Sequence, residues 1–294
     1  WDYPLSVNRL TSFGAQMYPK WVAALEEVSG LSAEFDVGGM QIQPPFDSAA
    51  ALGWCEKNAV RAEVTKEKNL WLPDVAQVRP PRLIAALKQT LLNRGVEIRE
   101  GVEALGLAVH QGGVSGVSTK TGQITACQYV LTSGAWIINL LNNNNNFYDL
   151  RPVRGQMLLF KGEPGRLKNI IFHDEKYVVP RRDGHILVGS TVEETGFDKR
   201  TTDAAKQELH QAGAAMFAPL AQLQPIGHWS GLRPGSKDNI PLIDRHPEWE
   251  NCFINAGHFR YGLTMAPAAA KLLTCLIQGE TPAISLGPYS SSKK

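Results

Sequence analysis

The sequence predicts a mixed α/β (α+β) fold in which α/β units flank a β-rich central segment. Helical periods alternate with short apolar strands near both ends of the chain, whereas strands dominate between Pro152 and Thr191. Segments of one type that enclose segments of the other are typical of two interleaved domains. The 294 residues, 43% of them apolar, suffice for a large core.

A long helix is predicted from Ser6 to Gly30. Apolar residues recur there every three or four positions, at Leu10, Phe13, Met17, Trp21, Leu25 and Val28. This period gives one buried face, with Ser6 as the expected N-cap and Gly30 as the C-cap. Because the chain opens at Trp1 and enters this helix almost at once, we expect that an upstream segment is missing.

The next segments predict a strand, a helix and a second strand. Residues 35–43 read as a strand that carries Gly38-Gly39 and ends at Pro44-Pro45. Arg79-Pro80-Pro81 opens a helix with leucines four residues apart, and Gly95 closes it. Val96-Glu97-Ile98 is the expected strand that follows.

Two further strands, 114–119 and 127–131, precede the small-residue turn Ser133-Gly134-Ala135-Trp136. A turn of this kind after an apolar strand favours a ligand site. Gly113-Val114-Ser115-Gly116 lacks the spacing of a nucleophile elbow and is interpreted as a hairpin turn. The polar tract 142–146 is expected to be a mobile surface loop.

The central strands are predicted at 157–160, 177–180 and 186–190, with the last two joined as a hairpin across Arg182-Asp183-Gly184. A helix over 202–217 is expected to cover this sheet. The last unit is a strand at 252–255, a loop over 256–264, and a helix that starts near Thr264 or Ala266 and ends near Gln278, with Gly279 as its cap.

Composition excludes several classes of function. A net charge of +2 without a basic cluster disfavours nucleic-acid binding. The four cysteines lie far apart, so neither a metal site nor a disulfide framework is indicated. With no apolar run long enough to cross a membrane and no signal peptide, a cytoplasmic protein is expected. There is no G-x-G-x-x-G turn and no Walker A motif, so any dinucleotide site must be completed elsewhere.

Two segments carry a specific resemblance. Trp229-Ser-Gly-Leu-Arg-Pro-Gly-Ser236 and Asn255-Ala-Gly-His-Phe-Arg-Tyr-Gly-Leu-Thr-Met-Ala-Pro267 resemble the C-terminal signature of the glycine oxidase branch of the D-amino-acid oxidase (DAO) family. Segments 151–157, 177–181 and 133–136 resemble the same branch, in consistent order. The resemblance implies an FAD-binding Rossmann-like domain, here incomplete, interleaved with an antiparallel substrate domain. Without its upstream part, the chain is expected to hold FAD poorly or not at all.

The loop over 257–264 has a physical reason to hold a flavin. It lies between a strand and a helix start, where free backbone N–H groups and the positive end of the helix dipole gather. A reduced flavin carries negative charge near its pyrimidine edge, so this position would stabilise the reduced form.

The resemblance also implies roles for individual residues. Arg233, which follows a glycine turn expected at Gly231 and is held by Pro234, would bind a substrate carboxylate in bidentate fashion. Tyr177 would close over the carboxylate, and Arg260 would lie near the amino acid. His258 is expected to be structural, because the α-hydrogen can leave as hydride without a protein base. Tyr261 replaces the asparagine common after H-F-R, which leaves substrate size open. The full set of cofactor contacts implied is Ala104 (through its backbone), Ser133, Gly134, Trp136, His258, Phe259, Arg260, Tyr261, Gly262, Leu263 and Thr264.

Two domains are expected. The FAD-binding domain comprises residues 1–20, 76–147 and 229–294, and the substrate-binding domain comprises residues 21–75 and 148–228. The expected activity is oxidation of glycine, another small amino acid or an N-methylated amine, with oxygen as acceptor and a link to thiazole synthesis for thiamine. A dehydrogenase of D-amino acids, proline or sarcosine, and a non-catalytic truncated chain or partner subunit without flavin, are the alternatives. The sequence leaves homo-oligomerisation open.

Overall fold

The computed structural model describes residues 3–141 and 148–291, so the tract at 142–146 lies outside the described residues. The fold is mixed α/β, as predicted. The chain forms two compact units. The first, called the sheet unit, comprises Leu31–Ala86 and Arg154–Leu232. The second, called the α1–α6 unit, comprises the described parts of Asp2–Gly30, Leu87–Val153 and Arg233–Lys294. The chain thus alternates between the units, and each is described by itself.

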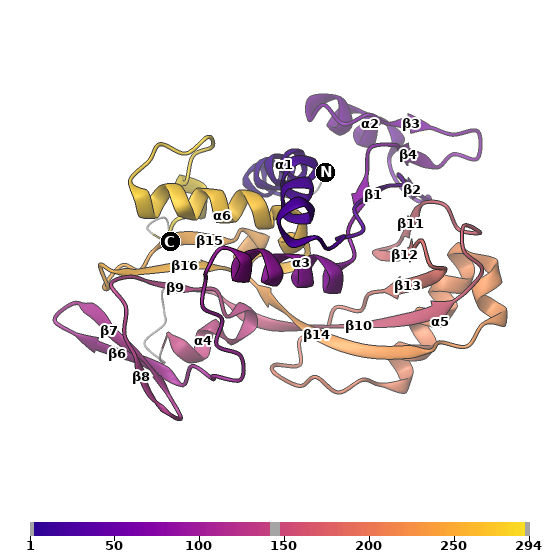
Figure 1. The fold of residues 1–294 in the computed structure, drawn as a ribbon. Helices are drawn as coiled ribbons and strands as arrows, with labels where there is room; N and C mark the ends of the chain where they lie inside the picture. Colours follow the sequence, from indigo (N-terminus) through magenta and orange to yellow (C-terminus); the bar gives the residue numbers. More distant parts are fainter. Residues whose placement is uncertain (1–2, 142–147, 292–294) are drawn as a thin grey trace. The chain divides into compact units, whose positions relative to one another are not determined.

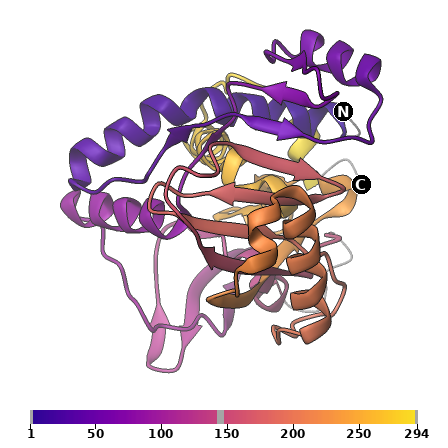
Figure 2. The same cartoon turned by 90° about the vertical axis from the view of Figure 1, so that its right-hand side faces the viewer.

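An eight-stranded sheet dominates the sheet unit, in the order β14-β10-β13-β12-β11-β2-β4-β3. Its strands are β2 (Met40–Ile42), β3 (Glu63–Val64), β4 (Leu70–Leu72), β10 (Arg151–Lys161), β11 (Ile170–His173), β12 (Lys176–Pro180), β13 (His185–Gly189) and β14 (Gly227–Gly235). Helix α5 (Asp203–Met216) packs on one face of the sheet (Figure 2). Its Leu209 belongs to the same buried apolar cluster as Leu158, Val178 and Val188. Thr202 caps this helix by accepting from the Ala205 N–H.

The remaining elements of the sheet unit are peripheral: the short pair β1 (Asp36–Val37) with β5 (Ala76–Gln77), helix α2 (Ser48–Lys57) and turn η2 (Ala218–Gln222). The hairpin of β12 and β13 across Arg182-Asp183-Gly184 is confirmed. Its alternating residues divide the sheet into two faces, because successive strand side chains point to opposite sides. One face packs against α5, and the other carries Tyr177.

Three strands form the central sheet of the α1–α6 unit, in the order β15-β16-β9. They are β9 (Tyr129–Leu131), β15 (Leu242–Arg245) and β16 (Cys252–Ala256). Helix α6 (Gly262–Gln278) lies over β15 and β16, and α1 (Leu5–Ser29) packs beside it (Figure 1). A second apolar cluster occupies the opposite face of the sheet, with Leu131, Ile254 and Leu242 at its centre.

The other elements of this unit surround that sheet. They are the antiparallel set β6 (Gly106–His110), β7 (Gly113–Thr119) and β8 (Gly122–Ile124), helix α4 (Ile137–Leu140), and the 3-10 turns η1 (Gly134–Trp136), η3 (Lys237–Asn239), η4 (Phe259–Tyr261) and η5 (Gly287–Tyr289). Helix α3 (Pro80–Asn93) contains the boundary between the two units at Ala86.

Both long helices end as predicted. Gly30 and Gly279 adopt φ values of 70° and 71°, and each donates its N–H back to the last turn of its helix. Only glycine takes this left-handed conformation without strain. The start of α1 differs from the prediction, because the helix begins at Leu5 with Pro4 at the cap position, and Ser6 already lies inside it.

Two predicted strands differ in the structure: the first is divided into the short strands β1 and β2, and the second is absent from the described residues. The strand over 35–43 is interrupted at Gly39, where φ is 72° and the N–H donates to the Val75 carbonyl at 2.9 Å. The Trp71 ring fills the space that a side chain at position 39 would need. Segment 96–98 has no strand partner among the described residues. Its Glu97 pairs with Arg99 in solvent at 2.7 Å instead.

Two predicted turns are strands. Gly113–Gly116 lies inside β7, and the hairpin turn is one step earlier, at Gln111 and Gly112, which adopt φ values of 47° and 78°. The Gly-Leu-Arg-Pro-Gly segment belongs to β14, where Gly231 has no positive φ. β14 is an edge strand, and this is where a sheet tolerates Pro234, which has no N–H to donate.

Gly14 fixes the packing of α1 on α6. A Cβ at this position would lie 2.1 Å from the Thr264 carbonyl oxygen, and backbone cannot yield easily. Alanine favours helix by about 1 kcal/mol over glycine, but overpacking costs about 1–3 kcal/mol and more against backbone. We therefore expect Gly14→Ala to lower the free energy of unfolding by about 2 kcal/mol, as measured by urea titration.

Gly53 in α2 is the matched control, because a Cβ there would meet no atom within 4 Å. Gly53→Ala is expected to stabilise the protein by up to about 1 kcal/mol. Equal effects of the two substitutions would contradict the packing role of Gly14.

Candidate functional site

Two segments that the sequence singled out follow neighbouring parallel strands. β9 and β16 pair in parallel, with Leu131 opposite Ile254, so their carboxyl ends meet at one edge of the sheet. Ser133, Gly134 and Trp136 follow β9, and the residues from His258 to Thr264 follow β16. In open α/β sheets, ligands bind beside the carboxyl ends of the strands. The structure thus places both sets of expected cofactor contacts at this edge.

A hydrogen bond joins the end of β14 to the loop after β16. The buried Ser236 hydroxyl donates to the Gly257 carbonyl at 2.7 Å. Gly257 adopts a φ of 76°, and a Cβ there would lie 3.0 Å from that of Ser236 and 2.8 Å from a methyl group of Leu150. Only glycine fits this approach. Because Arg233 lies three residues before Ser236, the Arg233 segment and the loop are neighbours.

The loop leads into α6 earlier than predicted. Residues 259–261 form a 3-10 turn, and the helix begins at Gly262 instead of Thr264 or Ala266. Within the part of the chain that the structure describes, no side chain caps this end of the helix. The first-turn N–H groups of a helix have no partner within it and carry the positive end of the dipole. Gly262, Leu263 and Thr264 therefore supply backbone donors that suit a negatively charged ligand group.

Three buried polar atoms near this edge show whether the residues present are compatible with a polar cofactor. Ser133 Oγ, Asn255 Oδ1 and His258 Nε2 are buried, and none has a hydrogen-bond partner among the described residues. A buried polar atom without a partner costs about 1–3 kcal/mol. A cofactor rich in donors and acceptors, such as FAD, would satisfy them, so the residues fit that group. Asn255 was not predicted as a contact, because strand periodicity alone marks it as a packed residue.

Burial lowers the pKa of His258 to about 4, although part of the residue reaches solvent. The native imidazole is therefore neutral, which fits the structural role expected for it and disfavours a proton-transfer role. The unfolded chain binds a proton near the ordinary value of about 6.5. The contribution of the neutral His258 to the free energy of unfolding is therefore fully present above about pH 6.5. It decreases as the pH drops from about 6.5 to about 4, and does not decrease further below the native pKa.

We expect this loss to be on the order of 3 kcal/mol, because each pKa unit corresponds to about 1.4 kcal/mol. Urea titrations between pH 7 and pH 4.5 measure it. His258→Gln should flatten this part of the profile, whereas His110→Gln, which alters an exposed imidazole on β6, should leave it as in wild type. An unchanged slope in His258→Gln would contradict the assignment.

The other expected contacts differ in exposure. Arg233 and Arg260 are partly buried, Trp136 is 44% exposed, and Ala104 is exposed in the segment before β6. Tyr177 belongs to the sheet unit, where it lies on β12 and is partly buried. Its hydroxyl is 3.9 Å from the Met157 sulfur. The structure brings the loop residues and Arg233 into one unit and places Tyr177 in the other.

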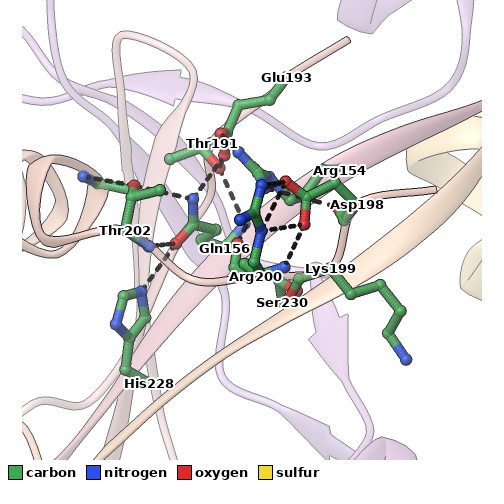
Figure 3. A network of polar contacts seen from close by, with 11 residues as sticks. Arg154, Gln156, Thr191, Glu193, Asp198, Lys199, Arg200, Thr202, His228 and Ser230 are labelled. Carbon is green, nitrogen blue, oxygen red and sulfur yellow. Dashed lines mark hydrogen bonds and ion pairs between the residues drawn. The ribbon is translucent and has the colours of Figure 1, made fainter. Parts of the chain in front are cut away.

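Sequence reasoning missed an ionic network in the sheet unit (Figure 3). At its centre, the Arg154 guanidinium donates to one Glu193 oxygen at 3.1 and 2.6 Å and lies 3.3 Å from Asp198. It also donates to the Arg200 carbonyl at 2.9 Å. The Arg154 side chain is only 6% exposed. Burying a charge is costly unless it is paired, and here the carboxylates provide the pairing.

Gln156 extends this network. Its Nε2 donates to Glu193 at 2.9 Å, and its Oε1 accepts from the Thr202 N–H at 2.9 Å. His228 Nε2 is 3.0 Å from the same oxygen, and since an amide oxygen only accepts, His228 donates from Nε2. Arg154 and Gln156 are two residues apart on β10 and therefore share a face of the sheet. This spacing was already visible in segment 151–157 of the sequence.

Among the described residues, no group of three His, Cys, Asp or Glu side chains is placed to hold a metal ion. Within the same residues, no helix has the length and apolar character needed to cross a membrane.

Comparison with known proteins gives matches along nearly the whole chain. The model of the DAO family, described as FAD dependent oxidoreductase, matches residues 6–276. A glycine oxidase of Pseudomonas aeruginosa is 35% identical over 306 aligned residues, which cover 99% of this chain and 84% of that protein. A bifunctional protein ThiO/ThiG of Synechocystis sp. is 31% identical, over 88% of this chain and 41% of that protein.

The fold also matches solved structures. The crystal structure of glycine oxidase from Geobacillus kaustophilus superposes with a TM-score of 0.92, covering 100% of this chain and 85% of that chain. The sequence identity in this superposition is 22%, so the match shows a shared fold.

Proposed function

Because the chain belongs to the DAO family of FAD-dependent oxidoreductases, we propose that it oxidises glycine or another small amino acid or N-methylated amine. The observation that carries this proposal is the sheet edge formed by the ends of β9 and β16 and the start of α6. Buried polar atoms at this edge have no hydrogen-bond partner among the described residues, and the Arg233 segment lies next to the loop after β16. The similarity to glycine oxidases narrows the substrate class to small amino acids.

When bound, FAD would supply the hydride acceptor for oxidation at the substrate α-carbon. The chain contributes the environment for this step. Backbone N–H groups of Gly262, Leu263 and Thr264, together with the α6 dipole, would favour negative charge on a flavin held beside them. Ser133 and His258 would satisfy polar groups of the cofactor, and Gly134, Trp136, Phe259 and Tyr261 would contact it.

Arg233 would hold the substrate carboxylate through a bidentate pair, which orients the α-carbon. Tyr177 would contact the same substrate and Arg260 would lie near it. Ala104 would contribute only its backbone, on the adenine side. Since Arg233 and Tyr177 belong to different units, each role needs its own variant. Oxygen would accept the electrons and yield hydrogen peroxide, and the imine product would hydrolyse or enter thiazole synthesis. The similarity to ThiO/ThiG supports that last link.

A substrate panel tests the proposal. Flavin-loaded protein is mixed in air with glycine, sarcosine, D-alanine and L-proline, and peroxide release is measured. The proposal predicts turnover of glycine or sarcosine with one peroxide per amine oxidised. Turnover without peroxide would indicate a dehydrogenase, and no turnover of any amine would contradict the proposed activity.

A further inference from the structure

Three residues form a row across the sheet unit, on neighbouring strands. In the register of β10, β13 and β12, Gly189 is opposite Met157 on one side and Tyr177 on the other. The Tyr177 ring lies over Gly189. A Cβ on this glycine would be 2.9 Å from the phenol oxygen and 3.0 Å from two ring carbons. The hydroxyl reaches past the glycine to the Met157 sulfur at 3.9 Å, a weak hydrogen bond.

This row lies on the face of the sheet opposite α5. The neighbouring residues Leu158, Val178 and Val188 are fully buried in the core beneath α5. Because strand side chains alternate, Met157 and Tyr177 point the other way, and both are partly exposed. The phenol is therefore accessible on its outer side while its inner side rests on bare backbone.

We propose that Gly189 is a positioning residue, which sets the place of the Tyr177 hydroxyl and thereby the affinity for small amino-acid substrates. This inference rests on the proposed role of Tyr177 as a substrate contact. Cβ atoms in proteins essentially never show contacts below 3.0 Å, so a Cβ at position 189 would displace the Tyr177 ring. A moved ring loses its contact with Met157 and takes its hydroxyl away from the substrate.

A double-mutant cycle tests the inference on the flavin-loaded protein. Gly189→Ala is expected to raise KM for the amine by about tenfold with kcat nearly unchanged, because it weakens binding in the ground and transition states alike. In a Tyr177→Phe background, the same substitution should change KM less than about twofold, since there is no hydroxyl left to displace. Equal effects in both backgrounds would overturn the proposal.

Gly213 on α5 provides the matched control. A Cβ there would lie 2.9 Å from a methyl group of Val188, a similar degree of crowding on the opposite face of the same strand. Gly213→Ala should lower the denaturation midpoint and leave KM unchanged. If it raises KM as Gly189→Ala does, general loosening of the sheet explains both effects and the proposal fails.

Two further measurements keep the test decisive. If Gly189→Ala does not fold, Met157→Leu removes the sulfur acceptor at similar volume, and should raise KM about two- to threefold in wild type only. If the wild-type protein oxidises no amine, the proposed function fails, but the inference on ring position can still be tested by crystal structures of wild type and Gly189→Ala. A ring that keeps its place over position 189 would overturn it.

Discussion

Arg233→Ala is expected to raise KM for glycine by about 100- to 1,000-fold, while FAD stays bound. The physical reason is the loss of a charge-assisted, bidentate pair with the substrate carboxylate, which contributes about 3–4 kcal/mol. Because the same pair is present in the transition state, kcat/KM should fall at least as much as KM rises. Steady-state kinetics with glycine, together with the flavin absorbance of the purified variant, measure this.

Arg233→Lys keeps the positive charge but loses the two parallel N–H donors of the guanidinium. Its KM for glycine should therefore lie between the values of wild type and Arg233→Ala. Arg61→Ala is the control: this arginine is 71% exposed and pairs with Asp74 at the surface of the sheet unit. It should leave KM at the wild-type value. A KM for Arg233→Ala within a few-fold of wild type, with flavin retained, would show that another group binds the carboxylate.

Glu193→Ala is expected to lower the free energy of unfolding by about 3–5 kcal/mol, because it leaves the buried Arg154 guanidinium short of its main partner. Burial by itself would raise the pKa of Glu193, but hydrogen bonds from Thr191, Arg154 and Gln156 outweigh it and hold the pKa below its ordinary value. A carboxyl group with a lowered native pKa stabilises the fold above its unfolded pKa, and this contribution is lost as pH falls through the native value.

Urea titration at pH 7 measures the loss of unfolding free energy in Glu193→Ala. The exposed Arg61–Asp74 ion pair serves as the control. Asp74→Ala removes the carboxylate from the exposed Arg61–Asp74 pair and is expected to lower the free energy of unfolding far less than Glu193→Ala does. The loss of unfolding free energy in Glu193→Gln should lie between those of Glu193→Ala and Asp74→Ala, because the amide retains one acceptor oxygen. If Glu193→Ala costs as little as Asp74→Ala, Arg154 does not depend on this carboxylate.

Local signals predicted the helices and the hairpin well. Gly30 and Gly279 marked the ends of α1 and α6, since each adopts the left-handed conformation that ends a helix. The resemblance to the DAO family, carried by two C-terminal segments, is confirmed by the family match. Local signals failed where glycine is compatible with both a turn and a strand. Gly231 suggested a turn, but it lies in the extended edge strand β14.

Long-range pairing was the main feature that the sequence did not reveal. Arg154 and Glu193 are 39 residues apart, and neither period nor composition relates them. The expected strand at 96–98 failed for a related reason, since a strand needs a neighbour and none of the described residues supplies one. Asn255 was overlooked because only the packed sheet shows that its side-chain oxygen is buried without a partner.

The most direct test of the proposed amine oxidation is an anaerobic reaction of the flavin-loaded protein with glycine, followed by the long-wavelength absorbance of the flavin. We expect glycine or sarcosine to bleach this absorbance in a single rapid phase, and Arg233→Ala to require far more substrate for the same rate. Flavin that stays oxidised in the presence of saturating glycine, sarcosine and D-alanine would contradict it.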